Sequence, residues 1–486
     1  MLFKIVAQNP TNLEDIKTFL YENHTNTLSE ENGFVYEYPV EERNTYSEEV
    51  PYIAFDKNNP LKKSKLVTLL KIQLGLSCNY TCSYCSQKFV ERPPETNRKD
   101  IDNFMAMLES LEFDETKGLK IEFWGGEPFV YWKTFKPLAE AIKEKFSTWE
   151  REPVLSVITN GSILSKEICM WLYYMGFNVA ISHDGPGQYV RGPDPFDDPD
   201  QKKIILDFYK TMKKQRRLSF NPMLNARNMS RKEIFNWFVE LTGDPTVELG
   251  EGGIVDAYDD DGIENSLNTY QAHFDFRKTA FGDIFETNGQ LGFKMIMDKV
   301  DGFTNNLLSH QSSDLLWQKC GMDNENVLAL DLRGNVFTCQ NVSAAEIGLN
   351  GEPHLSGHVT DIENVKIHTA THWSNRKECS GCPVLHLCKG ACMFLDKKYW
   401  DISCNNAYSD NVALFAASLY KITGYVPILI QNDELPLHRQ DVWGTLFEHK
   451  EKETRKIIPI KVVAEKTVLN DVEVFSKSRV EIVEGE

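Results

Sequence analysis

The sequence predicts an α/β protein in which a parallel sheet forms a partial (β/α)6 barrel and a small cysteine-rich α+β region follows it. Three observations predict this fold. Short apolar runs alternate with amphipathic helical patterns over residues 66–255. Polar loops follow most of the apolar runs. Of the 11 cysteines, all except Cys169 fall in two dense groups, one inside the expected barrel and one after it.

Each expected strand is followed by an expected helix or loop, as a parallel sheet with right-handed crossovers requires. The strands are predicted at Leu66–Leu74, Leu119–Trp124, Val154–Thr159, Phe177–Ser182, Leu218–Leu224 and, most weakly, Thr246–Leu249. The helices are predicted at 100–111, 133–146, 165–175, 201–216 and 231–242. Ser230 and Glu233 form a capping box that starts the last of these helices.

The positions of the polar loops favour a barrel over an open doubly wound sheet. Each loop comes directly after an expected strand, and the carboxyl ends of the strands form the rim at which barrels of this kind assemble active sites. A single such loop usually only makes a turn, but five on one rim predict a site there. The loops are Cys78–Cys85, Gly125–Pro128, Asn160–Gly161, His183–Pro186 and Asn225.

Composition and charge exclude several classes of partner. Lys and Arg number 53 against 71 Asp and Glu, which gives a net charge of −18 over 486 residues. This acidic excess argues against nucleic acid or an anionic membrane as the main partner. The longest apolar stretch, Val412–Tyr420, is shorter than the roughly 20 residues of a membrane span, and Met1–Gln8 lacks the pattern of an export signal. We therefore expect a cytoplasmic protein.

The first cysteine group has a Cys-x3-Cys-x2-Cys spacing. A disulfide network is not expected in a cytoplasmic chain of this size, and isolated Cys169 is expected to be a small buried residue. Thiolates at such short intervals are typical of iron–sulfur clusters or zinc. Structural zinc prefers four ligands, so a trio favours a four-iron cluster with one iron open to another ligand. The trio is Cys78, Cys82 and Cys85.

This trio, with Tyr84 before its last cysteine and Gly125-Gly126-Glu127-Pro128 one β–α unit later, resembles the radical S-adenosylmethionine (SAM) enzymes. The resemblance covers residues 66–255 and implies a TIM-like partial barrel. It implies that the trio binds a [4Fe–4S] cluster whose open iron is chelated by the methionine moiety of SAM. An electron from the cluster then cleaves SAM to a 5′-deoxyadenosyl radical, which abstracts hydrogen from the substrate.

The same resemblance assigns SAM contacts on the rim. The Gly-Gly-Glu loop is expected to meet the amine of SAM, Ser182 to reach its ribose, and Arg191 to pair with its carboxylate. The full set of expected SAM contacts is Tyr84, Gly125, Gly126, Glu127, Asn160, Ser182 and Arg191.

The second cysteine group resembles a SPASM domain, which adds two auxiliary iron–sulfur clusters to many radical enzymes. Val327–Asp331 and Val336–Cys339 predict a β-hairpin that presents Cys339 at its end, after a Gly-x4-Cys spacing. One cluster, expected to be [4Fe–4S] like the other, lacks a fourth cysteine, so it has an open iron or an oxygen ligand such as Asp323. The alternative for the whole group is structural zinc. The implied ligand sets are Cys379, Cys382, Cys388 and Cys404 for one cluster, and Cys320, Cys339 and Cys392 for the other.

Three functions stay open. Ribosomal-peptide maturases of this type cross-link, epimerise or otherwise alter a precursor peptide, and need an external one-electron donor such as a flavodoxin or ferredoxin. Anaerobic sulfatase-maturating enzymes make formylglycine but carry an Asp where this chain has Gln340, which is not a base at neutral pH. A non-catalytic iron–sulfur electron-transfer or scaffold protein is the third. We favour the peptide maturase.

The domains are expected at 1–65 (a cap or partial leader-binding region), 66–255 (the barrel), 256–310 (a linker), 311–425 (SPASM) and 426–486 (a C-terminal extension). Further expected elements are a strand at Leu2–Ala7, a helix at Asn12–Tyr21, a strand at Phe34–Val40, a solvated acidic linker at Asp256–Asp261, a helix near 407–422 and a charged stretch at Lys450–Lys456.

Overall fold

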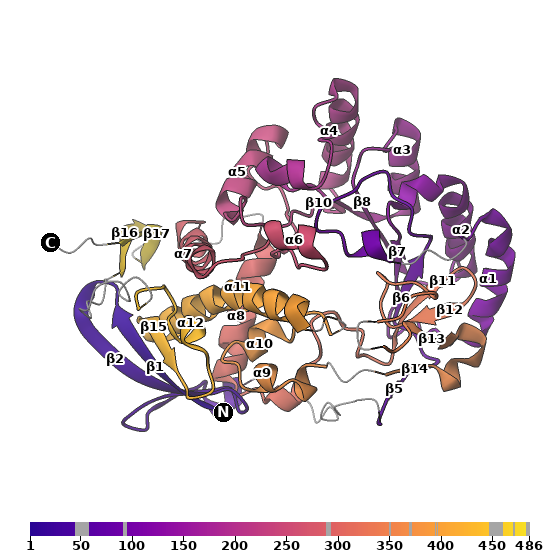
Figure 1. Ribbon diagram of the computed structural model, residues 1–486. Helices are drawn as coiled ribbons and strands as arrows, with labels where there is room; N and C mark the ends of the chain where they lie inside the picture. The colour runs from indigo at the N-terminus through magenta and orange to yellow at the C-terminus, as the bar shows by residue number, and fades with distance from the viewer. Residues whose placement is uncertain are drawn as a thin grey trace.

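The computed structural model describes residues 1–43, 58–90, 95–287, 293–348, 351–368, 372–393, 395, 397–446, 460–469 and 472–482. It has two lobes (Figure 1). One lobe holds a parallel sheet with helices along its outer side, and the other holds the N-terminal strands, the long helix α11 (Lys397–Thr423) and the C-terminal strands. Among the described helices, none combines the length and the apolar character needed to cross a lipid bilayer.

The parallel strands predicted from the sequence are confirmed. They lie in the order β10-β9-β8-β7-β6, so neighbours in space are also neighbours along the chain. Alternation along β7 turns Ile121 and Phe123 toward the buried outer core and leaves Glu122 and Trp124 on the inner face. The strands are β6 (Leu69–Gln73), β7 (Lys120–Trp124), β8 (Val154–Thr159), β9 (Asn178–Ile181) and β10 (Leu218–Phe220).

The helices of this lobe also agree with the sequence pattern. Ser230 starts α5 as predicted, because its hydroxyl accepts a hydrogen bond from Glu233 N at 3.1 Å. α3 and α5 both end at a glycine in the left-handed conformation, Gly176 and Gly243. The helices are α1 (Ile101–Met107), α2 (Trp132–Lys145), α3 (Lys166–Met175), α4 (Pro199–Lys213) and α5 (Arg231–Thr242).

The sixth parallel strand is not where the sequence placed it. Thr246–Leu249 makes only one parallel bridge, between Leu249 and Phe220. Instead β11 (Val327–Asp331), from the cysteine-rich region, pairs in parallel with β6 at the other edge of the sheet. All five residues of β11 are buried, which suits an internal strand better than a solvated hairpin. The predicted hairpin is confirmed, because β12 (Asn335–Phe337) pairs antiparallel with β11, and β13 (Leu355–His358) follows.

The prediction of a helix at Asn12–Tyr21 is wrong. These residues belong to a strand, β2, which pairs with β1 on one side and β3 on the other, and its Phe19 and Tyr21 point into the core. Two ladders of backbone hydrogen bonds therefore outweigh the helical spacing of its apolar residues. The strand predicted at Phe34–Val40 is reduced to β4. The strands are β1 (Leu2–Asn9), β2 (Asn12–Glu22), β3 (Thr27–Glu30) and β4 (Val35–Tyr36).

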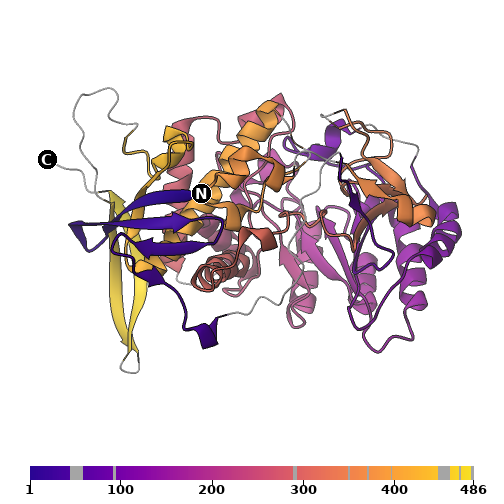
Figure 2. The same cartoon turned by 90° about the horizontal axis from the view of Figure 1, so that it is seen from below.

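The C-terminal segment completes the N-terminal sheet. β15 (Val426–Gln431) pairs antiparallel with β1, and α11 (Lys397–Thr423) packs against β15, α7 and α8. Figure 2 shows the indigo N-terminal strands and the yellow hairpin β16–β17 in this same lobe. The helix predicted near 407–422 begins earlier, so that it includes Cys404. The charged stretch Lys450–Lys456 lies outside the described residues.

The acidic segment predicted to be a solvated linker is partly buried. Ala257 is fully buried, and the Asp256 carboxylate accepts a hydrogen bond from Ser403 of α11, because the segment passes between the barrel rim and that helix. The remaining elements are α6 (Asp260–Glu264), α7 (Tyr270–Thr287), α8 (Lys294–Leu308), α9 (Lys377–Ser380), α10 (Leu385–Cys388), α12 (Leu437–Gln440), β5 (Leu61–Lys62), β14 (Lys366–Ile367), β16 (Ile460–Leu469) and β17 (Val472–Ile482).

Candidate active site

A cavity of about 510 Å³ lies at the carboxyl ends of the parallel strands. The sequence predicted a site at this rim, and the residues expected to bind the cluster and SAM there line this one cavity, whereas His183–Pro186 and Asn225 of the predicted rim loops do not. Backbone loops that are far apart in the chain thus converge as the barrel geometry requires. The expected residues that line the cavity are Cys78, Cys82, Tyr84, Cys85, Gly125, Gly126, Glu127, Asn160, Ser182 and Arg191.

The two glycines of the rim loop are required by close backbone packing. A Cβ atom on Gly126 would lie 2.5 Å from the carbonyl oxygen of Ser77, and one on Gly125 would lie 2.8 Å from that of Gly75. Glu127 N also donates a hydrogen bond to Ser77 O at 3.0 Å. The loop after β7 is therefore joined to the chain just before the cysteine trio, and both loops face the cavity without side chains between them.

The Glu127 side chain is used to hold the rim together. Its carboxylate is 1% exposed and accepts hydrogen bonds from Thr159 Oγ1 at 2.8 Å, Asn160 N at 2.7 Å and Phe129 N at 3.2 Å. Burial raises the pKa of Glu127 to about 7. The carboxylate of Glu127 is thus already hydrogen-bonded within the protein. The expected contact of this loop with the SAM amine stays a prediction, and only the backbone of the loop is left to make it.

Asp184 is a central residue of the site that the sequence did not identify. Its buried carboxylate accepts hydrogen bonds from Tyr84 Oη at 2.5 Å, Arg191 Nη2 at 2.7 Å and Met223 N at 2.8 Å. Arg191, expected to pair with the SAM carboxylate, thus already has a carboxylate partner, and its buried Nε has no partner among the described residues. The only sequence signal for Asp184 was its place in the His183–Pro186 loop after the fourth strand.

The cysteine trio lies at the mouth of this cavity. Cys78 is exposed, whereas Cys82 and Cys85 are half-buried. Tyr80 N lies 3.3 Å from Cys78 Sγ, as a backbone donor to a metal-bound thiolate does. In the described part of the chain, no three His, Cys, Asp or Glu side chains are gathered around a point as a single metal ion requires.

Part of the cavity wall comes from outside the barrel. Asp256 and Tyr258, from the segment after the barrel, and Asn341, from the cysteine-rich region, all line the cavity. Gln340 is not in this lining, and its amide oxygen lies 3.4 Å from Lys71 Nζ. Burial raises the pKa of Asp256. The sequence did not predict this composite wall, because the acidic run resembled a solvated linker.

The second cysteine group forms a separate, closed site. One ligand set expected for an auxiliary cluster lines a small cavity of about 20 Å³, together with Arg439 of α12. This set is Cys379, Cys382, Cys388 and Cys404.

The other expected set lies closer to the barrel. Burial raises the pKa of the Tyr258 phenol well above its usual value, and the charges of Cys392, Asp256 and Cys339 add to this, so Tyr258 lies near two of the three cysteines. Asp323, the expected oxygen ligand, is fully buried. Its Oδ2 accepts a hydrogen bond from Gln318 N at 2.6 Å and lies 3.1 Å from His372 Nε2, and its Oδ1 has no partner among the described residues. A buried unpaired carboxylate oxygen fits an additional ligand at this site.

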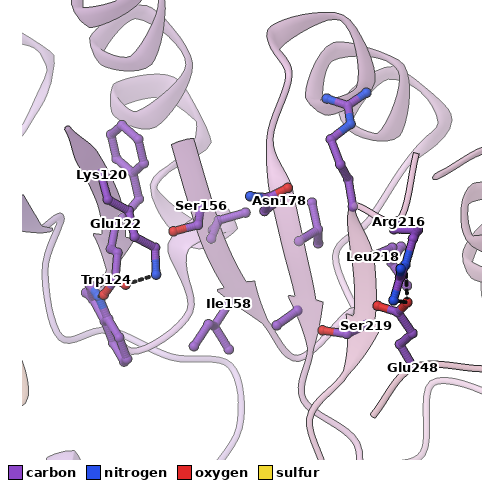
Figure 3. A pocket seen from close by; sticks show the side chains of 15 residues that line it. Lys120, Glu122, Trp124, Ser156, Ile158, Asn178, Arg216, Leu218, Ser219 and Glu248 are labelled. Carbon is purple, nitrogen blue, oxygen red and sulfur yellow. Dashed lines mark hydrogen bonds and ion pairs between the residues drawn. The ribbon is translucent and has the colours of Figure 1, made fainter. Parts of the chain in front are cut away.

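A cleft of about 250 Å³ runs along the inner face of the parallel sheet (Figure 3). There the Glu122 carboxylate accepts a hydrogen bond from Trp124 Nε1 at 2.9 Å and forms an ion pair with Lys120 Nζ at 2.6 Å. The cleft shares Phe123, Trp124 and Ile158 with the cysteine cavity. At the β10 edge it shares Arg216, Leu218, Ser219 and Glu248 with a third hollow of about 720 Å³. The three cavities therefore adjoin one another.

Comparison with known proteins agrees with this geometry. Residues 72–233 match the model of the Radical SAM superfamily. The chain is 22% identical over 391 residues to the radical SAM cyclopropyl synthase TigE of Paramaledivibacter caminithermalis, covering 75% of this chain and 74% of that protein.

Solved structures show a similar fold. Native anSMEcpe with bound AdoMet superposes with a TM-score of 0.53 at 17% identity, over 73% of this chain and 99% of that one. The same protein with AdoMet and the Cp18Cys peptide gives a TM-score of 0.50 at 18% identity, with the same coverage. Enzymes of this superfamily use SAM and a [4Fe–4S] cluster. Residues 72–233 are therefore a radical SAM domain.

Proposed function

We propose that this enzyme modifies a ribosomally made peptide by activating a C–H bond, through a cross-link, an epimerisation or a related change. The observation that carries the proposal is the row of adjoining cavities. It leads from the cysteine trio along the inner face of the sheet to the open edge beside β10. A long, laterally accessible cleft suits a polypeptide substrate better than a small molecule, which an enclosed pocket would surround.

In this proposal the cysteine trio holds a [4Fe–4S] cluster, and the glycine loop leaves room beside it for the methionine end of SAM. When bound, these two cofactors supply a radical that abstracts hydrogen. The residues of the chain orient the reactants: Tyr84 and Arg191 are both fixed by Asp184, so the wall of the cavity is preorganised. An external flavodoxin- or ferredoxin-like protein is the expected electron donor.

We assign Asp256 as the proton acceptor for the substrate. A cross-link that replaces a C–H and a second X–H bond would give one hydrogen atom to the radical, an electron to one of the proposed auxiliary clusters and a proton to a base, and Asp256 is a carboxylate in the lining of the cavity. Its Oδ1 accepts a hydrogen bond from Ser403 Oγ, which fixes the orientation of the carboxyl group. Asp256 thereby takes the place of the Asp that sulfatase-maturating enzymes carry at position 340.

The cysteine-rich region is proposed to be a SPASM domain with two auxiliary clusters. The four cysteines around the small closed cavity fit one complete cluster. The set of Cys320, Cys339 and Cys392 fits a second cluster, with Asp323 or a substrate group as its fourth ligand. Residues 1–65 are proposed as a cap or a partial leader-binding region.

The first experiment separates an enzyme from an iron–sulfur scaffold. Protein reconstituted with iron and sulfide is mixed anaerobically with SAM and dithionite, and 5′-deoxyadenosine is measured. Its formation supports the enzyme, whereas intact clusters without 5′-deoxyadenosine would leave only the scaffold.

The second experiment identifies the substrate. A small open reading frame beside the gene is co-expressed with the enzyme, and its peptide is analysed by mass spectrometry. A change in mass supports the peptide maturase, and a cyclopropyl group, which the relative TigE is named for, is one product to look for. An unmodified peptide together with formylglycine on a neighbouring sulfatase would favour the alternative function.

A further inference from the structure

Arg439 lies against the closed cysteine site, although it comes from the C-terminal segment, to which the sequence assigned no chemistry. It belongs to the short helix α12 and is 8% exposed. Its Nη2 donates a hydrogen bond to Cys404 Sγ at 3.2 Å, and it lines the same small cavity as the four cysteines. A cationic donor thus points directly at the sulfur of a proposed cluster ligand.

The guanidinium of Arg439 has no carboxylate partner within the described residues. Its other contacts are Asn405 Oδ1, at 3.1 Å from Nε and 2.8 Å from Nη2, and the ring of Tyr408, at 5.1 Å. An amide and a ring do not neutralise a cation, and a buried unpaired charge is costly. The compensating anion is therefore on the cysteine side.

A second buried arginine, Arg277, has different hydrogen-bond partners from Arg439. Arg277 also lies beside Tyr408, but its Nη1 donates to the carbonyl oxygens of His438 at 3.1 Å and Asp441 at 2.9 Å. Arg277 therefore fixes the backbone around α12. This fixed backbone holds Arg439 within hydrogen-bond distance of Cys404 Sγ. Tyr408 Oη donates to the carbonyl oxygen of Arg439 at 2.5 Å and fastens the helix further.

The neighbouring strand places this helix. β15 pairs with β1 of the N-terminal sheet, and Leu429 of β15 also bridges to Asp441, just after α12. The Asp441 carboxylate accepts hydrogen bonds from Gly444 N at 2.8 Å and Leu446 N at 2.7 Å, which closes the following turn. The position of Arg439 is thus built from both ends of the chain.

We propose that Arg439 is the counter-ion and hydrogen-bond donor of the auxiliary cluster held by the closed cysteine site, and that it raises the reduction potential of that cluster. Reduction adds negative charge to the cluster, so a nearby cation and an N–H donor to sulfur stabilise the reduced form. Arg439 is a positioning and tuning residue, not a catalytic one. The inference rests on the auxiliary-cluster part of the proposed function, but not on the identity of the peptide.

The test measures cluster potentials without any substrate. The full-length chain carries Cys78→Ala, Cys82→Ala and Cys85→Ala, so that only auxiliary clusters take up iron, and it is titrated electrochemically with detection by electron paramagnetic resonance. Adding Cys404→Ala identifies which reduction step belongs to the closed site, because that step disappears. If Cys404→Ala removes neither iron nor a step, the cluster assignment itself is wrong.

The decisive variant is Arg439→Gln in the same background. We expect the closed-site step to move to a more negative potential, while the other step stays in place. Arg216→Gln is the matched control: it also removes one positive charge, but from an arginine that pairs with Glu248 at 2.6 Å, away from the cysteines. An unchanged potential in Arg439→Gln, with all iron retained, would overturn the proposal.

If Arg439→Gln loses the cluster, the iron content of Arg439→Lys, which keeps the positive charge, is measured next. Recovery of iron in Arg439→Lys supports the role of a counter-ion. Failure of Arg439→Lys to recover iron, in a chain with the circular dichroism spectrum of the parent, would show that the arginine is needed for packing alone and would contradict the proposal.

Discussion

The two cysteine sites of this chain differ in what their arginines do. At the barrel rim, Arg191 is paired with Asp184 at 2.7 Å, and the cavity beside the cysteines measures about 510 Å³. In the C-terminal lobe, Arg439 donates to a cysteine sulfur at 3.2 Å, and the cavity measures about 20 Å³. The first site is thus lined around a large cavity, whereas the second leaves a space of about the size of one water molecule between its cysteines. The same residue type thus pairs with a carboxylate at one site and with a cysteine sulfur at the other.

The largest effect is expected from removing one cysteine at each site. Cys82→Ala should abolish the cleavage of SAM, because the open-iron cluster is lost. Cys404→Ala should lose about four irons per chain yet keep some uncoupled cleavage, because the barrel site stays intact. Iron content and 5′-deoxyadenosine are the measurements.

Cys169→Ala is the matched control for both variants, since Cys169 is buried in the core and distant from either group. Parent-level 5′-deoxyadenosine in Cys82→Ala would show that the trio is wrongly assigned. An equal and complete loss of cleavage in Cys404→Ala would remove the functional difference between the sites.

The next largest effect concerns the composite wall of the open site. Asp256→Asn should lower the amount of modified peptide per 5′-deoxyadenosine by about 100-fold or more, the usual worth of a general base. Because burial raises the pKa of Asp256, the parent should lose this coupling as the pH falls, and at a higher pH than an ordinary Asp would.

Asp260→Asn serves as the control, because Asp260 belongs to the same acidic run but is exposed and paired with Lys398. If Asp256→Asn and Asp260→Asn give the same ratio of product to 5′-deoxyadenosine, then Asp256 is not the proton acceptor.

A smaller loss should follow from filling the glycine loop. The Cβ atom of Gly126→Ala would meet Ser77 O at 2.5 Å and push the two rim loops apart. Misplacement by about 1 Å can cost about 100-fold in rate, so we expect a loss of up to that size in SAM cleavage. The closed site should keep its iron.

Gly253→Ala is the matched glycine variant, because a Cβ atom there meets nothing within 4 Å. It should cleave SAM at the rate of the parent. Equal rates in Gly126→Ala and the parent would mean that the loop is not held against the cysteine segment as described.

The smallest effect is on stability. The pKa of Glu127 is raised from 4.5 to about 7 in the folded chain. Between these values the folded state holds more protons than the unfolded state, so the free energy of unfolding should fall as pH rises, by about 3 kcal/mol in all. Glu127→Gln should remove this dependence. Urea unfolding between pH 5 and 8 measures it, and parallel curves for both proteins would contradict the burial of this carboxyl group.

The parallel strands and the loops at their carboxyl ends were predictable because they are local in the sequence. Five parallel strands and their helices follow from apolar periodicity and caps, and the cysteine spacing with the Gly-Gly-Glu loop predicted the residues that line the cavity. The sequence predictions were wrong where contacts between segments distant in the chain determined the structure. Asn12–Glu22 became a strand because partners lay on both sides, and Asp256 became buried because α11 covers it. No local pattern reports either contact.

Residue type and spacing predicted the cysteine trio, the glycine loop and the strands that run in parallel, since these depend on neighbours a few positions apart, whereas the ligand sets of the second cysteine group were implied by the family resemblance. The tertiary structure decided which distant segments meet. It brought β11 to the far edge of the barrel sheet, Asp184 under Tyr84 and Arg191, and Arg439 against Cys404. Such contacts depend on loop closure and on pairing of buried charges across hundreds of residues or across separate elements, and a linear pattern carries neither.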